Sequence, residues 1–182
     1  MRKPNKSRST VRAARTLPPR GFREVLKLLP AVSAPVVQST QALLRGPSPL
    51  TPAEREFIYQ YCSRANGCTY AATSHSSCAI ALGMPEKAFR TPPARLKPLL
   101  QFARKLTLKP ASIAPKDAAR LLAAGWDERA IADVIYICAL VGWTNRVLFG
   151  FSVPVDKQQL IAGGAKIAAN GYLPTVEAIV QS

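Results

Sequence analysis

Several residue types that support common functional sites are scarce in this sequence. Histidine occurs once, and no two of the four cysteines are separated by two residues. Zinc sites combine several such ligands at short spacings, so we expect no metal and no bound cofactor. The chain of 182 residues is 48% hydrophobic, which gives it an ample core. A secreted disulfide framework is therefore not expected, and we predict a reducing, cytoplasmic location.

Acidic residues are also scarce, with 10 against 25 Lys and Arg, for a net charge of +15. Residues 1–50 contain ten Lys or Arg and a single acid, Glu24, so most of the excess lies there. We expect residues 1–20 to form a disordered basic tail and residues 21–182 to form one helical domain. A nucleic-acid partner is left open but is less favoured than a solvated tail, and an organelle transit peptide is the alternative to a cytoplasmic protein.

Strand-like alternation and apolar runs of transmembrane length are both missing, so we predict an all-α protein with no membrane partner. Aromatic residues make up only 7% of the chain, which favours helix packing through small side chains. Expected helices span about residues 33–46, 51–65, 68–83, 96–109, 115–125, 128–149 and 156–169, with a short last helix from Pro174.

The stretch from residue 51 to residue 83 carries most of the chemistry. Thr51-Pro-Ala-Glu54 has the form of a capping box with proline at the first helical position. Asn66-Gly67 would end that helix, because both residues tolerate a positive φ. A second helix follows at once, so helices of about residues 52–65 and 68–82 should pack as an antiparallel hairpin.

This hairpin would bring together an acid, Glu56, a thiol, Cys68, and the only histidine, His75. The N-terminus of a helix favours a thiolate, so Cys68 is a candidate nucleophile. His75 lies seven residues further on, about 10 Å along the axis, so Glu56 or a water would have to bridge the two. If buried, Glu56 should have a raised pKa.

The other three thiols are weaker candidates for a catalytic role. Cys62 lies near the end of the first helix and is a candidate auxiliary thiol to Cys68, although a core role is the simpler interpretation. Cys78 is one turn beyond His75, which could tune it, and Cys138 lies in an apolar helix as a core residue.

The sequence also resembles a known family. Gly46-Pro-Ser-Pro-Leu-Thr-Pro-Ala-Glu-Arg-Glu56, Ser63-Arg-Ala-Asn-Gly-Cys68 and His75 resemble the alkylhydroperoxidase D-like, carboxymuconolactone decarboxylase family, in its peroxidase-related branch. The family motif is Glu, eleven residues, Cys, two residues, Cys, three residues, His. Glu56, Cys68 and His75 match it in register, whereas Ala71 stands at the second cysteine. The stretches 102–107, 124–127 and 145–146 match the family's second half.

The resemblance implies an all-helical homo-oligomer, a dimer, trimer or hexamer, that reduces a hydroperoxide substrate with electrons from an external thiol or dithiol. Glutamate and histidine relay protons in that family. Because Ala71 removes one thiol, no disulfide can close within the motif. The hypothesis is therefore a peroxiredoxin-like antioxidant activity through Cys68, with Glu56 and His75. The alternatives are a helical module that binds an anionic partner, or acid–base chemistry on a lactone by Glu56 and His75.

Overall fold

The computed structural model describes residues 21–181, and the predicted tail of residues 1–20 lies outside them. The all-α prediction is confirmed, and no strand occurs in the described residues. The α-helices of this part are α1 (Phe22–Leu26), α2 (Pro30–Arg45), α3 (Pro52–Ala65), α4 (Thr69–Ala81), α5 (Lys97–Leu108), α6 (Pro115–Ala123), α7 (Glu128–Gly150), α8 (Lys157–Asn170) and α9 (Leu173–Val180). Short 3-10 helices are η1 (Glu86–Phe89), η2 (Ala94–Leu96) and η3 (Pro110–Ser112).

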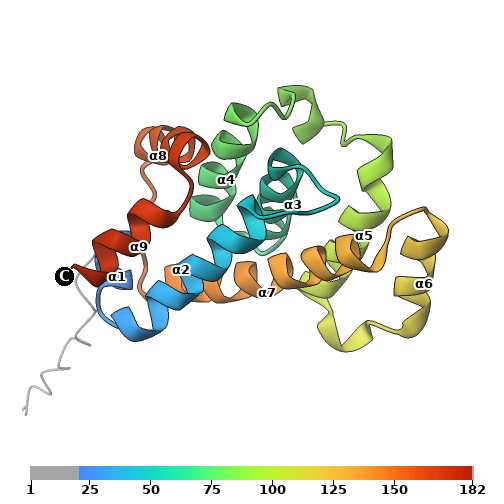
Figure 1. The fold of residues 1–182 in the computed structure, drawn as a ribbon, viewed down its shortest axis with the longest axis horizontal. Helices are drawn as coiled ribbons and strands as arrows, with labels where there is room; N and C mark the ends of the chain where they lie inside the picture. Colours follow the sequence, from blue (N-terminus) through green and yellow to red (C-terminus); the bar gives the residue numbers. More distant parts are fainter. Residues whose placement is uncertain (1–20, 182) are drawn as a thin grey trace, which may run out of the picture.

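The predicted hairpin of α3 and α4 lies at the centre of the molecule (Figure 1). The Thr51 hydroxyl accepts from the N–H of Glu54, and the Glu54 carboxylate accepts from the N–H of Thr51 at 3.0 Å. Both halves of the expected capping box are therefore present. Gly67 has φ of +73°, so the turn between the helices uses a conformation that glycine adopts without strain.

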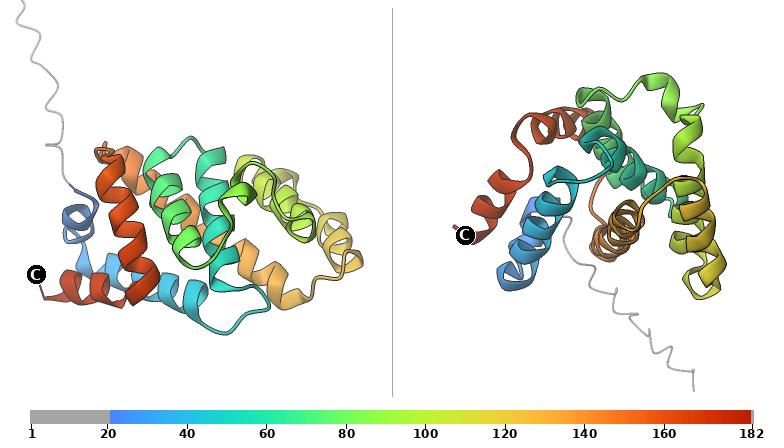
Figure 2. Two further views of the ribbon diagram at one scale, coloured as in Figure 1. Left: turned by 90° about the horizontal axis from the view of Figure 1, so that it is seen from above. Right: turned by 45° about the vertical axis from the view of Figure 1, so that its right-hand side comes forward.

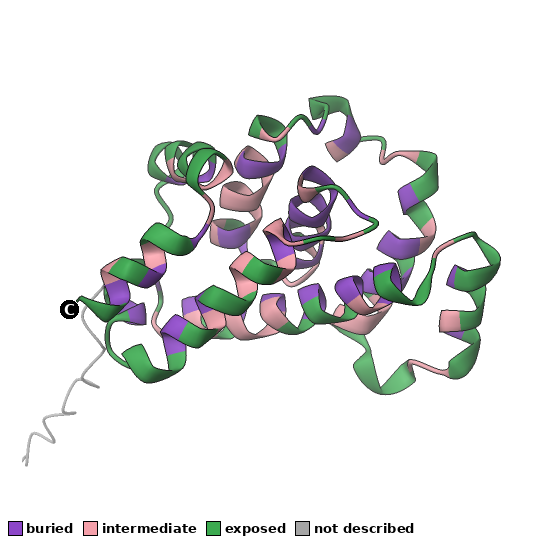
Figure 3. Ribbon diagram, viewed as in Figure 1, coloured by how far each residue is buried: buried purple, intermediate pink, exposed green. Residues whose placement is uncertain are grey.

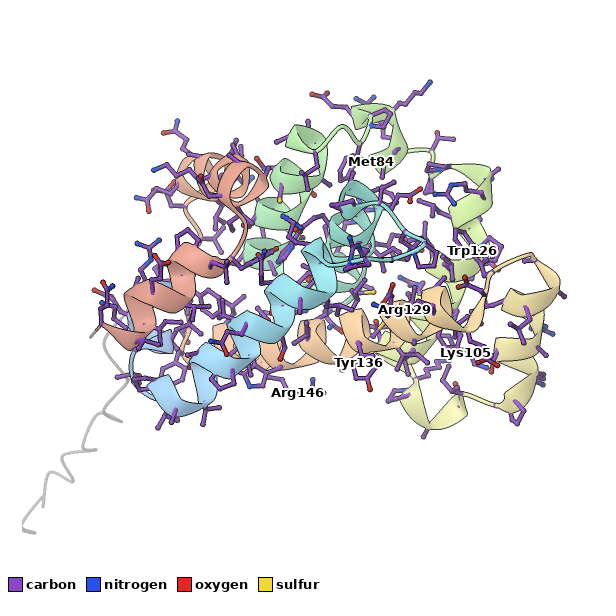
Figure 4. The ribbon with its side chains drawn as sticks, viewed as in Figure 1. Met84, Lys105, Trp126, Arg129, Tyr136 and Arg146 are labelled. Atoms are coloured by element: carbon purple, nitrogen blue, oxygen red, sulfur yellow. The ribbon has the colours of Figure 1, made fainter. Side chains whose placement is uncertain are left out.

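Helix α7 runs along most of the length of the molecule (Figure 1). Its start is capped by Asp127, whose carboxylate accepts from the N–H of Ala130 at 2.8 Å. One side packs against α2, α3 and α5, while Tyr136 and Arg146 lie on the outward side (Figure 4). The helix is long and apolar enough to cross a bilayer, but the central helix of a soluble core has the same properties. In the described part of the chain, α7 packs against α2, α3 and α5.

Helix α8 lies across α4 in very close approach (Figure 2). Gly164 makes this approach possible, because a Cβ there would lie 2.8 Å from the Cβ of Ser77 and 2.9 Å from the N of Cys78. Helix α8 is continuous through Gly163 and Gly164, and Gly164 is a packing residue that lets two backbones meet.

Helix α2 begins earlier than expected, at Pro30 rather than after Ser33, and it contains Pro35. Proline is favourable at the first helical position, which explains the early start. The ring of Pro35 removes one helical N–H, and the helix continues because it is held by packing against α7 and α9. Burial is most complete on α3, where ten of fourteen residues are buried (Figure 3).

Candidate functional site

Glu56 is the centre of a buried charged cluster. Its side chain has no exposed surface, and its two carboxylate oxygens have three partners. Arg45 Nη2 lies 2.7 Å from Oε1, and the Tyr172 hydroxyl donates to the same oxygen at 2.8 Å. His75 Nδ1 lies 2.5 Å from Oε2. A carboxylate this deeply buried is stable only with such charge-assisted partners.

The cluster is assembled by elements far apart in the sequence. Glu56 and His75 come from the two helices of the hairpin, Arg45 is the last residue of α2, and Tyr172 directly precedes α9. Tyr172 is fixed by its backbone N–H, which donates to Gln41 Oε1 of α2 at 2.7 Å. The C-terminal end of α2 and the residue before α9 therefore cover the site that the hairpin forms.

The charge state of Glu56 differs from the sequence-based expectation. Burial raises the pKa of its carboxyl, but His75 and then Arg45 act more strongly together, and the pKa is lowered. The prediction of a raised pKa was wrong because it considered burial without the two partners His75 and Arg45. Burial lowers the pKa of Arg45, yet Glu56 and Tyr172 outweigh it, so that pKa is raised. Glu56 and Arg45 are therefore an ion pair at neutral pH.

Tyr59 is a site residue that the sequence interpretation missed. Its ring stacks on His75 with centroids 3.6 Å apart and an interplanar angle of 14°. Its hydroxyl donates to Thr144 Oγ1 at 2.7 Å. Burial raises the pKa of this phenol. Tyr59 lies three residues after Glu56 on α3, so the helical spacing was the signal that could have placed it beside the acid.

Cys68 precedes α4 and is buried, with 2% of its surface exposed. Burial raises the pKa of its thiol, and the backbone N–H groups of Ala71 and Tyr70 oppose this only in part. The expected stabilised thiolate is therefore not what the surroundings favour. No hydrogen bond between Cys68 and His75 occurs among the described residues, in agreement with the helical separation. Ala71 is itself buried, so the missing thiol position is filled by a methyl group in the core.

Cys62 and Cys138 form a buried thiol pair. Their sulfurs are 3.8 Å apart, joining α3 to α7. The contact with Cys62 lowers the pKa of Cys138. Cys138 is 8% exposed, as expected of a core residue. A role of Cys62 as an auxiliary thiol to Cys68 stays a prediction.

Cys78 lies against the Glu56 cluster. Arg45 Nη2 donates to its sulfur at 3.2 Å. Burial, and next the charge of Glu56, raise the pKa of this thiol. The sequence suggested that His75 would influence Cys78, but the hydrogen bond to its sulfur comes from Arg45.

A separate hollow of about 680 Å³ lies on another side of α4. Its wall includes Gln60, Arg64, Thr73 and Ile161, but neither His75 nor any cysteine. The size of a cavity therefore does not locate the reactive groups here, and the charged cluster does. The described residues contain no group of three metal-binding side chains.

Two solved structures resemble this fold. An uncharacterized peroxidase-related protein from Silicibacter sp. TM1040 is 27% identical, with a TM-score of 0.62 over 69% of this chain and 71% of that one. A second, described as an alkylhydroperoxidase AhpD core and an uncharacterized peroxidase-related protein from Ralstonia eutropha JMP134, is 23% identical, with a TM-score of 0.67 over 77% of this chain and 78% of that one. No protein-family model and no curated protein matches the chain. The motif residues, the helical hairpin and these neighbours agree: the chain has the alkylhydroperoxidase D-like fold and resembles the peroxidase-related proteins of that family.

Proposed function

We propose that this protein is a thiol-dependent hydroperoxide reductase. The observation that carries the proposal is the fully buried Glu56, which is held ionised by His75 and Arg45 beside the free thiol of Cys78. An ionised acid in contact with a histidine is suited to moving protons during a reaction at a neighbouring sulfur. The resemblance to peroxidase-related proteins supports the same activity.

Cys68 is the thiol that the family register assigns to the reaction. Its sulfur would attack the outer oxygen of the hydroperoxide, break the O–O bond and become a sulfenic acid. The alkoxide that leaves would take a proton through His75 and Glu56. An external thiol or dithiol would then reduce the sulfenic acid and release water. We propose that this occurs in a cytoplasmic homo-oligomer.

Peroxide consumption in the presence of excess dithiol tests this proposal. The wild type should consume hydrogen peroxide faster than dithiol alone, and Cys68→Ser and His75→Asn should each slow it at least tenfold. Cys138→Ala, which removes a buried thiol outside the Glu56 cluster, is the matched control and should keep the rate. A wild type with no activity above dithiol alone would refute the reductase. A rate unchanged in Cys68→Ser would show that a different thiol reacts.

A further inference from the structure

We infer that Cys78 is a reactive thiol of this site, and that Glu56 receives its proton when it attacks a hydroperoxide. This inference rests on the proposed reductase function and identifies a thiol that the sequence motif does not. In the motif the second thiol precedes the histidine by four residues, where this chain has Ala71. Cys78 follows His75 by three residues, and positions 71, 75 and 78 share one face of a helix. Cys78 therefore places a thiol on the other side of the same histidine.

The contacts of Cys78 distinguish it from the other cysteines. A single atom, Arg45 Nη2, lies 3.2 Å from the Cys78 sulfur and 2.7 Å from Glu56 Oε1. The sulfur and the carboxylate therefore lie side by side under one guanidinium group. The sulfur accepts a hydrogen bond from Arg45, and the negative charge of Glu56 adds to burial in raising the pKa of the thiol. A nucleophile that lies beside both a base and a cation has the partners that nucleophilic catalysis requires.

The remaining thiols lack this arrangement among the described residues. The hydrogen bonds recorded for Cys62 and Cys138 join them to each other, to Thr107 and to the Ala103 carbonyl. The groups that act on Cys68 are backbone N–H groups, and no acid is among them. Among the cysteines of the described chain, only Cys78 lies beside both an acid, Glu56, and the cation that pairs with it, Arg45.

The polar and charged groups around Cys78 come from different parts of the fold. Arg45 comes from α2, Glu56 from α3, and Tyr172 from the residue before α9. Helix α8 contributes Gly164, whose backbone meets the backbone of α4 without a side chain. Glu56 disfavours a resting thiolate, so the thiol stays protonated until the base takes its proton during the attack.

In the proposed reaction, the Cys78 sulfur attacks the outer oxygen of the hydroperoxide while its proton passes to the Glu56 carboxylate. The O–O bond breaks, and the departing alkoxide takes the proton back from Glu56, so an alcohol or water and a sulfenic acid are formed. The sulfur is oxidised and the peroxide is reduced. Two equivalents of an external thiol then return Cys78 to the thiol, forming a disulfide between them and water.

A disulfide between Cys78 and Cys68 is not expected. The two residues are ten positions apart on one helix, or about 15 Å by the helical rise. Cysteine Cα atoms must lie within about 7 Å to be bridged. The sulfenic acid on Cys78 should therefore persist until an external thiol or a trapping reagent reaches it. Arg45 and His75 have 14% and 11% of their side chains exposed, which leaves an edge for a small peroxide.

Mass spectrometry with a dimedone trap tests the inference on the full chain. The protein is treated with one equivalent of hydrogen peroxide, and the label is quantified separately at each of its four cysteines. Cys78 should carry label in addition to Cys68. Its labelling rate should fall at least tenfold in Arg45→Met and in Glu56→Gln, with circular dichroism confirming that each variant is folded. Cys138→Ala, a buried thiol elsewhere in the core, should leave labelling of Cys78 unchanged.

The outcomes separate this inference from the proposed function. Label on Cys68 with none on Cys78 would overturn the inference and leave the reductase intact. If Cys78 is labelled as fast in Arg45→Met and Glu56→Gln as in the wild type, the inference is also overturned, because Glu56 and Arg45 would then have no part in the attack. An absence of label on every cysteine, together with no peroxide consumption, would refute the reductase itself.

Discussion

Replacing Glu56 by glutamine removes the negative charge from the centre of the buried cluster while keeping the shape of the side chain. Arg45 and His75 lose their ionised partner, and Tyr172 donates to a neutral oxygen at best. Breaking a buried ion pair by removing one partner costs about 3–5 kcal/mol. Arg45 keeps 14% exposure and Gln retains one acceptor oxygen, so we expect a loss near the lower end, about 3 kcal/mol.

Glu54→Gln is the matched control, on the same helix and two residues away. Its partner Arg95 is 53% exposed, so the ion pair should contribute less than about 1 kcal/mol. Glutamine also serves at this position of a capping box, so the helix start should be preserved. Urea unfolding followed by tryptophan fluorescence, at one fixed protein concentration, measures both losses. Equal losses for the two variants would refute the account of Glu56 as a buried ionised centre.

The pH dependence of this difference gives a second check. The folded pKa of Glu56 is lowered relative to the unfolded chain. Its stabilisation is therefore complete above the unfolded pKa of about 4.3, and it is lost as the pH falls through the lower folded value. The wild type should be more stable than Glu56→Gln by the largest margin at pH 7, and the two stabilities should converge as the pH falls from about 4.3 through the lowered folded pKa of Glu56. A difference that grows on acidification would contradict the assignment.

Two further pairs of variants test the packing and the hydrogen bonds around the site by the same urea assay. Gly164→Ala should destabilise the protein by about 1–3 kcal/mol, because the added Cβ would meet the backbone of α4. Gly163→Ala has open space around the new Cβ and should stabilise the protein by about 0.5–1 kcal/mol. Stability changes of the same sign in both variants would contradict the close approach of the two helices. Tyr172→Phe should cost about 1.5–3 kcal/mol by losing a hydrogen bond to a charged group, and Tyr59→Phe about 0.5–1.5 kcal/mol by losing a neutral one. A larger loss of stability for Tyr59→Phe than for Tyr172→Phe would contradict this assignment of the charged and neutral hydrogen bonds.

The hairpin was predictable because its signals are local. A capping box, a proline at the first helical position and a glycine turn lie within the residues that they control. Glu56 and His75 were also found from the sequence, by their register in a motif, and the structure brings their side chains into contact. Short-range chemistry and a specific spacing carry enough information for this much of the site.

The partners of Glu56 could not be predicted in the same way. Tyr172 is 116 residues from Glu56 along the chain, and its contact depends on how α9 folds back onto α2. Arg55, the neighbour of Glu56 in sequence, does not supply the guanidinium, because its side chain donates to the Leu43 carbonyl. Arg45 reaches Glu56 only through tertiary packing, so its part in lowering the pKa of Glu56 could not be inferred from the sequence. The role of Gly164 was hidden for the same reason.

Thiol titration before and after peroxide tests the central claim most directly. The full-length protein, fully reduced, has four thiols. It is treated with one equivalent of hydrogen peroxide, then denatured and titrated with and without prior reduction by dithiothreitol. The account predicts that about one thiol is lost and that dithiothreitol restores it. Four titratable thiols after peroxide, with the peroxide unconsumed, would contradict the claim that this cluster supports hydroperoxide reduction.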